Sequence, residues 1–160
     1  MAPTYSIKSK IYIKTLKAYY LALAGCNGCL PPLKRALNHL PITLVREPHE
    51  ADIIFVTGLL TKASIDFCKR LFKGLVQPYS VIRIGTCLAE TAPGFLKPET
   101  NSALAARMDK FFPIEMEIKG CPPSAKDIID RLETFLAYFD ITPEITKMIE
   151  KRLDRQVFDE

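Results

Sequence analysis

Four of the five cysteines in this 160-residue chain have a glycine one or two residues away. Cysteine thiolates can bind metals or exchange electrons. Cys26 and Cys29 form a Cys-x-x-Cys pair, whereas Cys87 and Cys121 stand alone further along the chain. In a chain that we expect to be cytoplasmic, cysteines are more typical of ligands or redox groups than of structural disulfides. The odd number also means that complete internal pairing would leave one cysteine over.

Glycines accompany each of these cysteine sites. They are Gly25 and Gly28 at the pair, Gly85 shortly before the third cysteine and Gly120 before the fourth. Glycine lets the backbone turn sharply and approach a bulky cofactor closely. Amide groups at such turns can donate hydrogen bonds to cluster sulfides. Pro122 follows Cys121, and a Cys-Pro pair is found in loops that bind iron–sulfur clusters. We therefore expect these glycines and Pro122 to line a cofactor.

Four thiolates from separate parts of the chain match the usual ligand set of a [4Fe–4S] cluster. Two other interpretations stay open. The Cys-x-x-Cys pair could be a thioredoxin-type dithiol, which would leave Cys87 and Cys121 without a role. Four cysteines could also bind structural zinc, although such sites usually combine two Cys-x-x-Cys knuckles and this chain has one.

Short apolar runs that alternate with helical patterns must position these cysteines. The runs that predict strands cover residues 18–24, 42–45, 51–57, 80–85 and 114–118. The patterns that predict helices follow Pro31-Pro32, cover residues 62–75 and 102–108, and begin at Ser124 and Thr142. Ser124, with Asp127 three residues later, resembles a capping box. Cys68 lies on the apolar face of the helix over 62–75, so we expect it to be a core residue.

Alternating strands and helices indicate an α/β fold with a mainly parallel sheet, and five strands suggest the flavodoxin-like doubly wound order. In such sheets ligands bind beyond the carboxyl ends of the strands, and the four cysteines follow three of these ends. One link fits poorly, because a parallel crossover usually needs a dozen or more residues and only a few separate residues 45 and 51. We therefore expect the strand over 42–45 to be misplaced or to run antiparallel at an edge.

Composition and charge exclude several classes of protein. Hydrophobic residues make up 48% of the chain and charged residues 25%, which is typical of a globular domain. A net charge of +4 is too mild and too scattered to indicate nucleic-acid binding. The longest apolar run, over residues 18–25, is shorter than the ~18–20 residues that a membrane span needs. Residues 1–17 lack the apolar core of a signal peptide, so we expect a cytoplasmic location.

Four motifs in this chain, taken in order, resemble those of a known family. They are Gly25-Cys-Asn-Gly-Cys29, Glu50-Ala-Asp-Ile-Ile-Phe-Val-Thr-Gly58, Gly85-Thr-Cys87 and Gly120-Cys-Pro-Pro123. Together they resemble the small subunit of [NiFe] hydrogenases and the related 20 kDa, cluster-bearing subunit of respiratory complex I. The Cys-x-x-Cys spacing is similar to that of hydrogenases, whereas complex I subunits typically carry adjacent cysteines. The short chain looks most like the minimal small subunits of energy-converting, membrane-associated hydrogenases.

This resemblance implies an electron-transfer subunit without a catalytic residue of its own. The implied ligands of one [4Fe–4S] cluster are Cys26, Cys29, Cys87 and Cys121. The implied partners are a [NiFe] hydrogenase-type large subunit, a ferredoxin-like subunit and possible membrane-arm subunits, with the chain peripheral on the cytoplasmic face of the membrane. We expect one iron–sulfur-binding domain over residues 1–140 and a helical tail over residues 141–160 that docks on a partner. A complex I-like, quinone-reducing module and a structural zinc-binding module remain alternatives.

Overall fold

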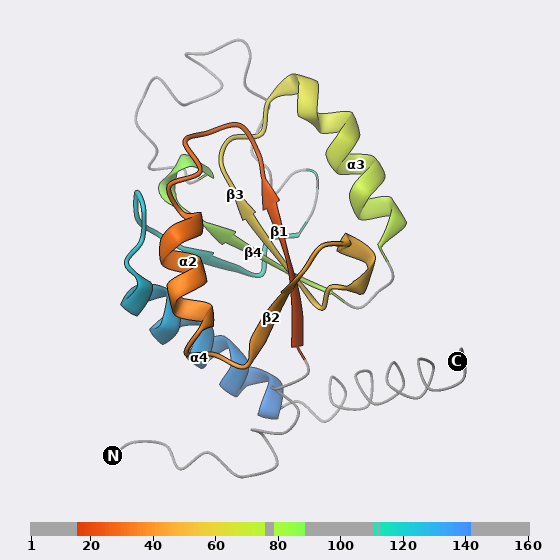
Figure 1. The fold of residues 1–160 in the computed structure, drawn as a ribbon. Helices are drawn as coiled ribbons and strands as arrows, with labels where there is room; N and C mark the ends of the chain where they lie inside the picture. Colours follow the sequence, from red (N-terminus) through yellow and green to blue (C-terminus); the bar gives the residue numbers. More distant parts are fainter. Residues whose placement is uncertain (1–15, 76–78, 89–110, 112, 142–160) are drawn as a thin grey trace, which may run out of the picture.

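One sheet of five parallel strands organises the fold (Figure 1). The structure, a computed structural model, describes residues 16–75, 79–88, 111 and 113–141. The strands are β1 (Leu16–Ala22), β2 (Ile42–Val45), β3 (Ile53–Thr57), β4 (Ser80–Ile84) and β5 (Met116–Ile118). Their order across the sheet is β2-β1-β3-β4-β5. This order confirms the predicted α/β fold with a flavodoxin-like, doubly wound sheet.

The short link between β2 and β3 has a simple explanation in the strand register. Val45, at the end of β2, lies opposite Tyr19 of β1, and Ile53, at the start of β3, lies opposite Ala18. β3 therefore begins at the level where β2 ends. The link crosses β1 sideways, over a distance of roughly 10 Å set by two strand spacings, and does not run back along the sheet. The prediction that this strand is misplaced or antiparallel is wrong, although β2 does lie at an edge.

Helices cover both faces of the sheet (Figure 1). α2 (Leu30–Leu37) and α4 (Ala125–Ile141) pack on one face, and Leu33 and Leu132 join Phe55 and Ile82 in its core. α3 (Ile65–Gly74) packs on the other face, after a 3-10 turn, η2 (Lys62–Ser64). Two further 3-10 turns are η1 (Pro48–Glu50) and η3 (Thr86–Leu88). Cys68 lies in the core between α3 and the sheet and is 1% exposed. This burial confirms the prediction that Cys68 is a core residue.

The ends of several elements differ from the predictions. β1 spans residues 16–22 where residues 18–24 were expected, because Leu23 and Ala24 already belong to the loop that follows. Ala24 makes an isolated antiparallel bridge with Leu59, so the apolar run continues beyond the strand. The helix expected over 62–75 begins as the η2 turn and becomes α-helical at Ile65. The loop at 91–100 and the helices expected at 102–108 and 142–155 lie outside the described residues.

The start of α4 follows the predicted capping box. The Asp127 backbone N–H donates to Ser124 Oγ at 3.1 Å, and the Ser124 backbone N–H donates to Asp127 Oδ2 at 3.3 Å. These bonds satisfy amide groups that a helix start leaves without intrahelical partners. Within the part of the chain that the structure describes, no helix combines the length and hydrophobicity needed to cross a membrane.

Candidate metal centre

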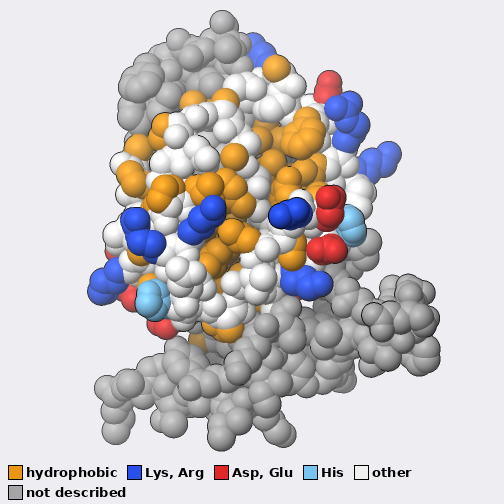
Figure 2. Space-filling view, in the orientation of Figure 1, with side chains coloured by type: hydrophobic (Ala, Val, Ile, Leu, Met, Phe, Trp, Pro, Cys, Tyr) orange, Lys and Arg blue, Asp and Glu red, His pale blue; other side chains and the backbone are white. Residues whose placement is uncertain are grey.

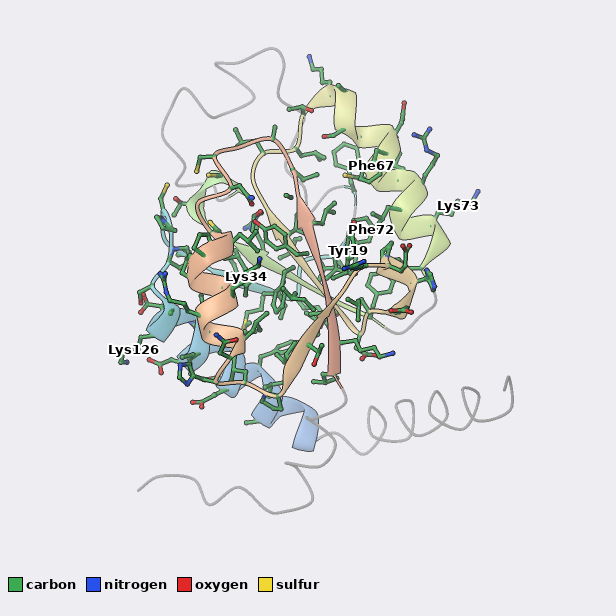
Figure 3. All side chains as sticks on the ribbon, viewed as in Figure 1. Tyr19, Lys34, Phe67, Phe72, Lys73 and Lys126 are labelled. Atoms are coloured by element: carbon green, nitrogen blue, oxygen red, sulfur yellow. The ribbon has the colours of Figure 1, made fainter. Side chains whose placement is uncertain are left out.

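The four predicted ligands lie on three loops at the carboxyl edge of the sheet. The loop after β1 carries Cys26 and Cys29, η3 after β4 carries Cys87, and the loop after β5 carries Cys121. Figure 3 shows several sulfur atoms gathered beside η3 at this edge. Cys29 is buried, Cys87 is half-buried, and Cys26 and Cys121 are exposed. The sheet topology thus brings together residues that are far apart in the sequence, as predicted.

The first loop is a tight turn that ends in α2. Asn27 adopts a left-handed backbone conformation with φ of 57°, and its carbonyl accepts a hydrogen bond from the Leu30 N–H at 3.2 Å. The Gly28 N–H points at Cys26 Sγ, 3.4 Å away. Cys29 is the N-cap of α2, and its carbonyl accepts from the Leu33 N–H. This turn fixes both cysteines relative to the start of α2.

The second and third loops are joined to each other by the backbone. The Gly85 N–H donates to the Ile118 carbonyl at 2.9 Å, and the Thr86 N–H donates to the Gly120 carbonyl at 2.8 Å. These two bonds extend the β4–β5 pairing beyond the ends of the strands. Cys87 and Cys121 follow directly and lie within hydrogen-bonding reach of each other. The two loops therefore form one half of the site, and the loop after β1 forms the other.

The two halves of the site approach each other at Gly85. Its φ is +96°, and a Cβ added there would lie 2.8 Å from Cys29 Sγ and 3.6 Å from the Gly120 carbonyl oxygen. A side chain would therefore fill the space beside the buried thiol, and the backbone conformation also favours glycine.

The other predicted lining residues also lie at the site. Gly28 is next to the Cys26 sulfur, and Gly25 packs against the Cα of Gly58. Gly120 has a φ of +141° and lies against Pro123, and a cis peptide bond joins Cys121 to Pro122.

The four thiols influence one another electrostatically. Burial, followed by the charges of Cys87, Cys26 and Cys121, raises the pKa of the Cys29 thiol to about 11. Burial also raises the pKa of Cys87, with further contributions from the charges of Cys121 and Cys26 and from a hydrogen bond with Cys121. These four groups cannot all ionise cheaply on their own, because like charges at short range repel. A positively charged metal group would relieve that repulsion, and thiolates are its natural ligands.

Across residues 16–75, 79–88, 111 and 113–141, no group of three or more Cys, His, Asp or Glu side chains is arranged to hold a metal ion. A tetrahedral zinc ion needs all its sulfur ligands about 2.3 Å from one centre. A cluster of four irons is larger, and its cysteines surround a volume of iron and sulfide. Four thiolates are a donor set that either group accepts.

Comparison with known proteins decides the family. The family described as NADH ubiquinone oxidoreductase, 20 Kd subunit, matches residues 21–135 of this chain. The chain belongs to this family. The match begins within β1 and ends within α4, so it contains all four cysteines of the site.

Proteins of archaea and bacteria resemble this member of the 20 kDa subunit family along much of its length. A probable membrane-bound hydrogenase subunit, mbhJ, of Pyrococcus furiosus is 30% identical over 117 residues, which cover 69% of this chain and 68% of that protein. An uncharacterized protein of Methanocaldococcus jannaschii is 31% identical over 136 residues, covering 81% and 84%. An NADH-quinone oxidoreductase subunit of Sorangium cellulosum is 30% identical over 103 residues, covering 62% of this chain and 50% of that protein.

A solved structure supports the fold of this family member. A chain of the membrane-bound sulfane sulfur reductase, an archaeal respiratory membrane complex, superposes with a TM-score of 0.66. The two chains are 20% identical, and the match covers 86% of this chain and 77% of the other. At this identity the likeness concerns the arrangement of strands and helices.

The sequence did not reveal three polar residues beside the first loop. The Tyr20 hydroxyl lies 2.6 Å from Asn27 Oδ1 and 2.8 Å from Thr57 Oγ1. Tyr20 and Thr57 lie on different strands, 37 positions apart in the sequence. The apolar runs that contain them predict strands and give no sign of this contact. A weak signal was present at Asn27, because asparagine is enriched among residues with left-handed backbone conformations.

Proposed function

We propose that this chain is an electron-transfer subunit of a membrane-associated oxidoreductase complex and that it holds one [4Fe–4S] cluster. The proposed ligands are Cys26, Cys29, Cys87 and Cys121. The observation that carries the proposal is that three loops place four mutually interacting thiols at one edge of a parallel sheet. Membership of the 20 kDa subunit family supports it independently.

The donor set and its surroundings fit such a group. Four thiolates are the usual ligands of a [4Fe–4S] cluster. Gly85 keeps the space beside Cys29 free of a side chain. The Gly28 N–H is directed at Cys26 Sγ, and hydrogen bonds to ligand sulfur are among the factors that set cluster potentials.

A bound cluster would accept and release single electrons, and the chain's own residues would hold it and control its surroundings. Buried Cys29 anchors the group on the protein side, next to the first turn of α2. Cys26 and Cys121 are exposed, so this edge of the sheet stays accessible to a redox partner. Proton transfer and the making and breaking of covalent bonds would take place on that partner, because the described part of the site offers thiol ligands and no separate acid or base.

The partner that we propose is a [NiFe] hydrogenase-type large subunit, with a ferredoxin-like subunit as the second electron partner. The similarity to the probable membrane-bound hydrogenase subunit of Pyrococcus furiosus supports this choice, as does the Cys26-Asn-Gly-Cys29 spacing. The complex would lie on the cytoplasmic face of the membrane, held there by other subunits. The helical tail that we expect beyond residue 140 would dock on one of these subunits.

A second candidate is a complex I-like module that passes electrons toward a quinone. The similarity to an NADH-quinone oxidoreductase subunit favours it, although this chain spans half of that protein. The large subunit that purifies with this chain separates the two candidates. A hydrogenase-type partner needs two Cys-x-x-Cys pairs that could bind nickel and iron, and a partner without them refutes the hydrogenase version while leaving electron transfer intact.

Anaerobic reconstitution with iron and sulfide tests the cofactor. The full chain should take up about four irons with matching acid-labile sulfide and become brown, as four-thiolate ligation requires. Cys87→Ala and Cys121→Ala should each lose most of the iron. Cys68→Ala is the matched control, because Cys68 is buried in the core on the α3 side of the sheet, and it should load normally. A colourless protein that binds one zinc ion would refute the cluster and favour a structural zinc module.

A further inference from the structure

Tyr20 connects three parts of the molecule at the first half of the site. Its ring lies on β1, on the face covered by α2 and α4, and packs against the core there. Its hydroxyl donates to Asn27 Oδ1 at 2.6 Å and lies 2.8 Å from the hydroxyl of Thr57, at the end of β3. A phenol has one proton to donate, so Thr57 donates to Tyr20 while Tyr20 donates to Asn27. The three side chains form a directed chain of hydrogen bonds from the sheet to the loop.

Thr57 gives this chain of hydrogen bonds a rigid origin. Thr57 is 3% exposed, and its backbone pairs with Ala22 of β1. Its carbonyl also accepts a hydrogen bond from the Leu23 N–H at 2.9 Å. The loop that carries the cysteines begins at Leu23, so the hydroxyl of Tyr20 is held by a buried part of the sheet.

Asn27 is the residue in the loop that most needs support. Its backbone has φ of 57°, which residues other than glycine adopt at some energetic cost. Two hydrogen bonds depend on this turn: the Gly28 N–H to Cys26 Sγ at 3.4 Å and the Leu30 N–H to the Asn27 carbonyl at 3.2 Å. If Asn27 left this conformation, Cys26 would move relative to Cys29.

The charges of the two thiols of the first loop also act on the Tyr20 phenol. Burial raises the pKa of the Tyr20 phenol against the opposing hydrogen bond from Thr57, and the charges of Cys29 and Cys26 raise it further. The Tyr20 phenol therefore interacts electrostatically with the thiols of Cys26 and Cys29.

We propose that Tyr20 is a positioning residue of the metal centre. Its hydroxyl holds Asn27 in the left-handed turn and so fixes the Cys26 sulfur and the Gly28 amide relative to Cys29. The inference rests on the proposed function for the identity of the cofactor, whereas the effect on the turn can be measured without any cofactor.

Tyr20→Phe removes the hydroxyl and keeps the ring in the core. In the metal-free chain, amide hydrogen exchange at Leu30 should become about fivefold faster, since a hydrogen bond of ordinary strength supports the turn. In the reconstituted chain, iron should be lost to a chelator several-fold faster. The midpoint potential should fall, because a weaker amide bond to Cys26 sulfur stabilises the reduced cluster less.

Tyr19→Phe is the matched control. Tyr19 neighbours Tyr20 on β1 but lies on the α3 side of the sheet, near Phe72 (Figure 3). Its substitution should leave the Leu30 exchange rate, the iron loss and the potential unchanged. Asn27→Gly in the Tyr20→Phe background should restore slow exchange and slow iron loss, because glycine adopts the left-handed turn without support.

The outcomes separate this inference from the proposed function. Equal Leu30 exchange rates in Tyr20→Phe and Tyr19→Phe would overturn the role of Tyr20, whether or not the cluster binds. Failure of Asn27→Gly to restore either rate would also overturn it. If the wild-type chain takes up no cluster, the proposed function fails, and the Leu30 exchange rates still decide whether Tyr20 holds the turn.

Discussion

Replacing Gly85 by alanine tests whether the close approach of the two halves of the site is essential. The added Cβ would lie 2.8 Å from the buried sulfur of Cys29, which is shorter than real Cβ contacts. The sulfur cannot move away freely, because Cys29 is the N-cap of α2 and is 8% exposed. The substitution also forces a side chain onto a backbone with φ of +96°.

Two separate costs contribute to the expected loss of stability. The unfavourable backbone conformation costs about 1–2 kcal/mol for a residue with a Cβ. Overpacking against Cys29 adds about 1–3 kcal/mol. We therefore expect Gly85→Ala to lower the free energy of unfolding by about 2–5 kcal/mol, a large share of the ~5–15 kcal/mol typical of a domain. The same displacement of Cys29 should sharply reduce the iron content after reconstitution.

Urea unfolding of the metal-free chain measures the first effect, and iron and sulfide analysis measures the second. Gly74→Ala is the control, because a Cβ at Gly74 has no neighbour within 4 Å and Gly74 is the last residue of α3. Alanine there should leave stability unchanged or raise it by up to about 1 kcal/mol, and cluster loading should be normal. If Gly85→Ala unfolds at the wild-type urea concentration and binds a full complement of iron, the reasoning about this contact is wrong.

Three further predictions concern pH, the α4 cap and the effect of loading. In the metal-free chain, the pKa of Cys29 rises from about 9.0 to about 11, so the folded state keeps a proton that the unfolded state releases. The contribution of Cys29 to the free energy of unfolding should therefore be unaffected below about pH 9 and should fall as the pH rises from about 9 to about 11. Cys29→Ala should make the decline measured in urea titrations less steep, and the thiols of Cys87 and Cys68, whose pKa values are also raised by burial, should retain a smaller decline. Ser124→Ala removes the capping hydroxyl of α4 and should cost about 1 kcal/mol in urea unfolding, with normal iron content as the sign that the site itself is intact. Reconstitution should raise the midpoint temperature of thermal unfolding, because a group that binds only the folded state stabilises it, and an unchanged midpoint in iron-loaded protein would contradict a site built from all three loops.

The sequence was sufficient to predict the parallel sheet, the capped start of α4 and the place of the four cysteines. Hydrophobic periodicity indicates the strands and helices, because a strand buried on both faces and an amphipathic helix leave different patterns. The spacing of Ser124 and Asp127 indicates the cap. The burial of Cys68 followed from the same periodicity. Since parallel strands end at one edge, the convergence of three loops followed from topology alone.

Other features depend on register and could not be read from the chain. β2 and β3 pair with different parts of β1, so a short link can join them although they are parallel. The usual length of parallel crossovers predicts a longer link. The pairing of Ala22 with Thr57 brings the Thr57 hydroxyl to Tyr20, and no local pattern specifies that register. Gly58 ends one of the four sequence motifs, and the sequence did not show that its φ is +88° or that a Cβ there would clash with the Ala24 carbonyl in the loop after β1.

The two halves of the site are attached to different strands, so a cofactor bound to both halves would link separate parts of the sheet. The first half is tied to β3 through Leu23 and Thr57, and the second joins β4 to β5 through Gly85 and Ile118. Ionised thiols would push these halves apart, whereas a cationic group bound to thiolates of both would link them. Stabilisation by the cofactor would then require ligands from both halves at once. Loss of one cysteine from either half should remove nearly all of that stabilisation, and a second loss from the other half should add little, which is the non-additivity expected of groups that act through one shared partner.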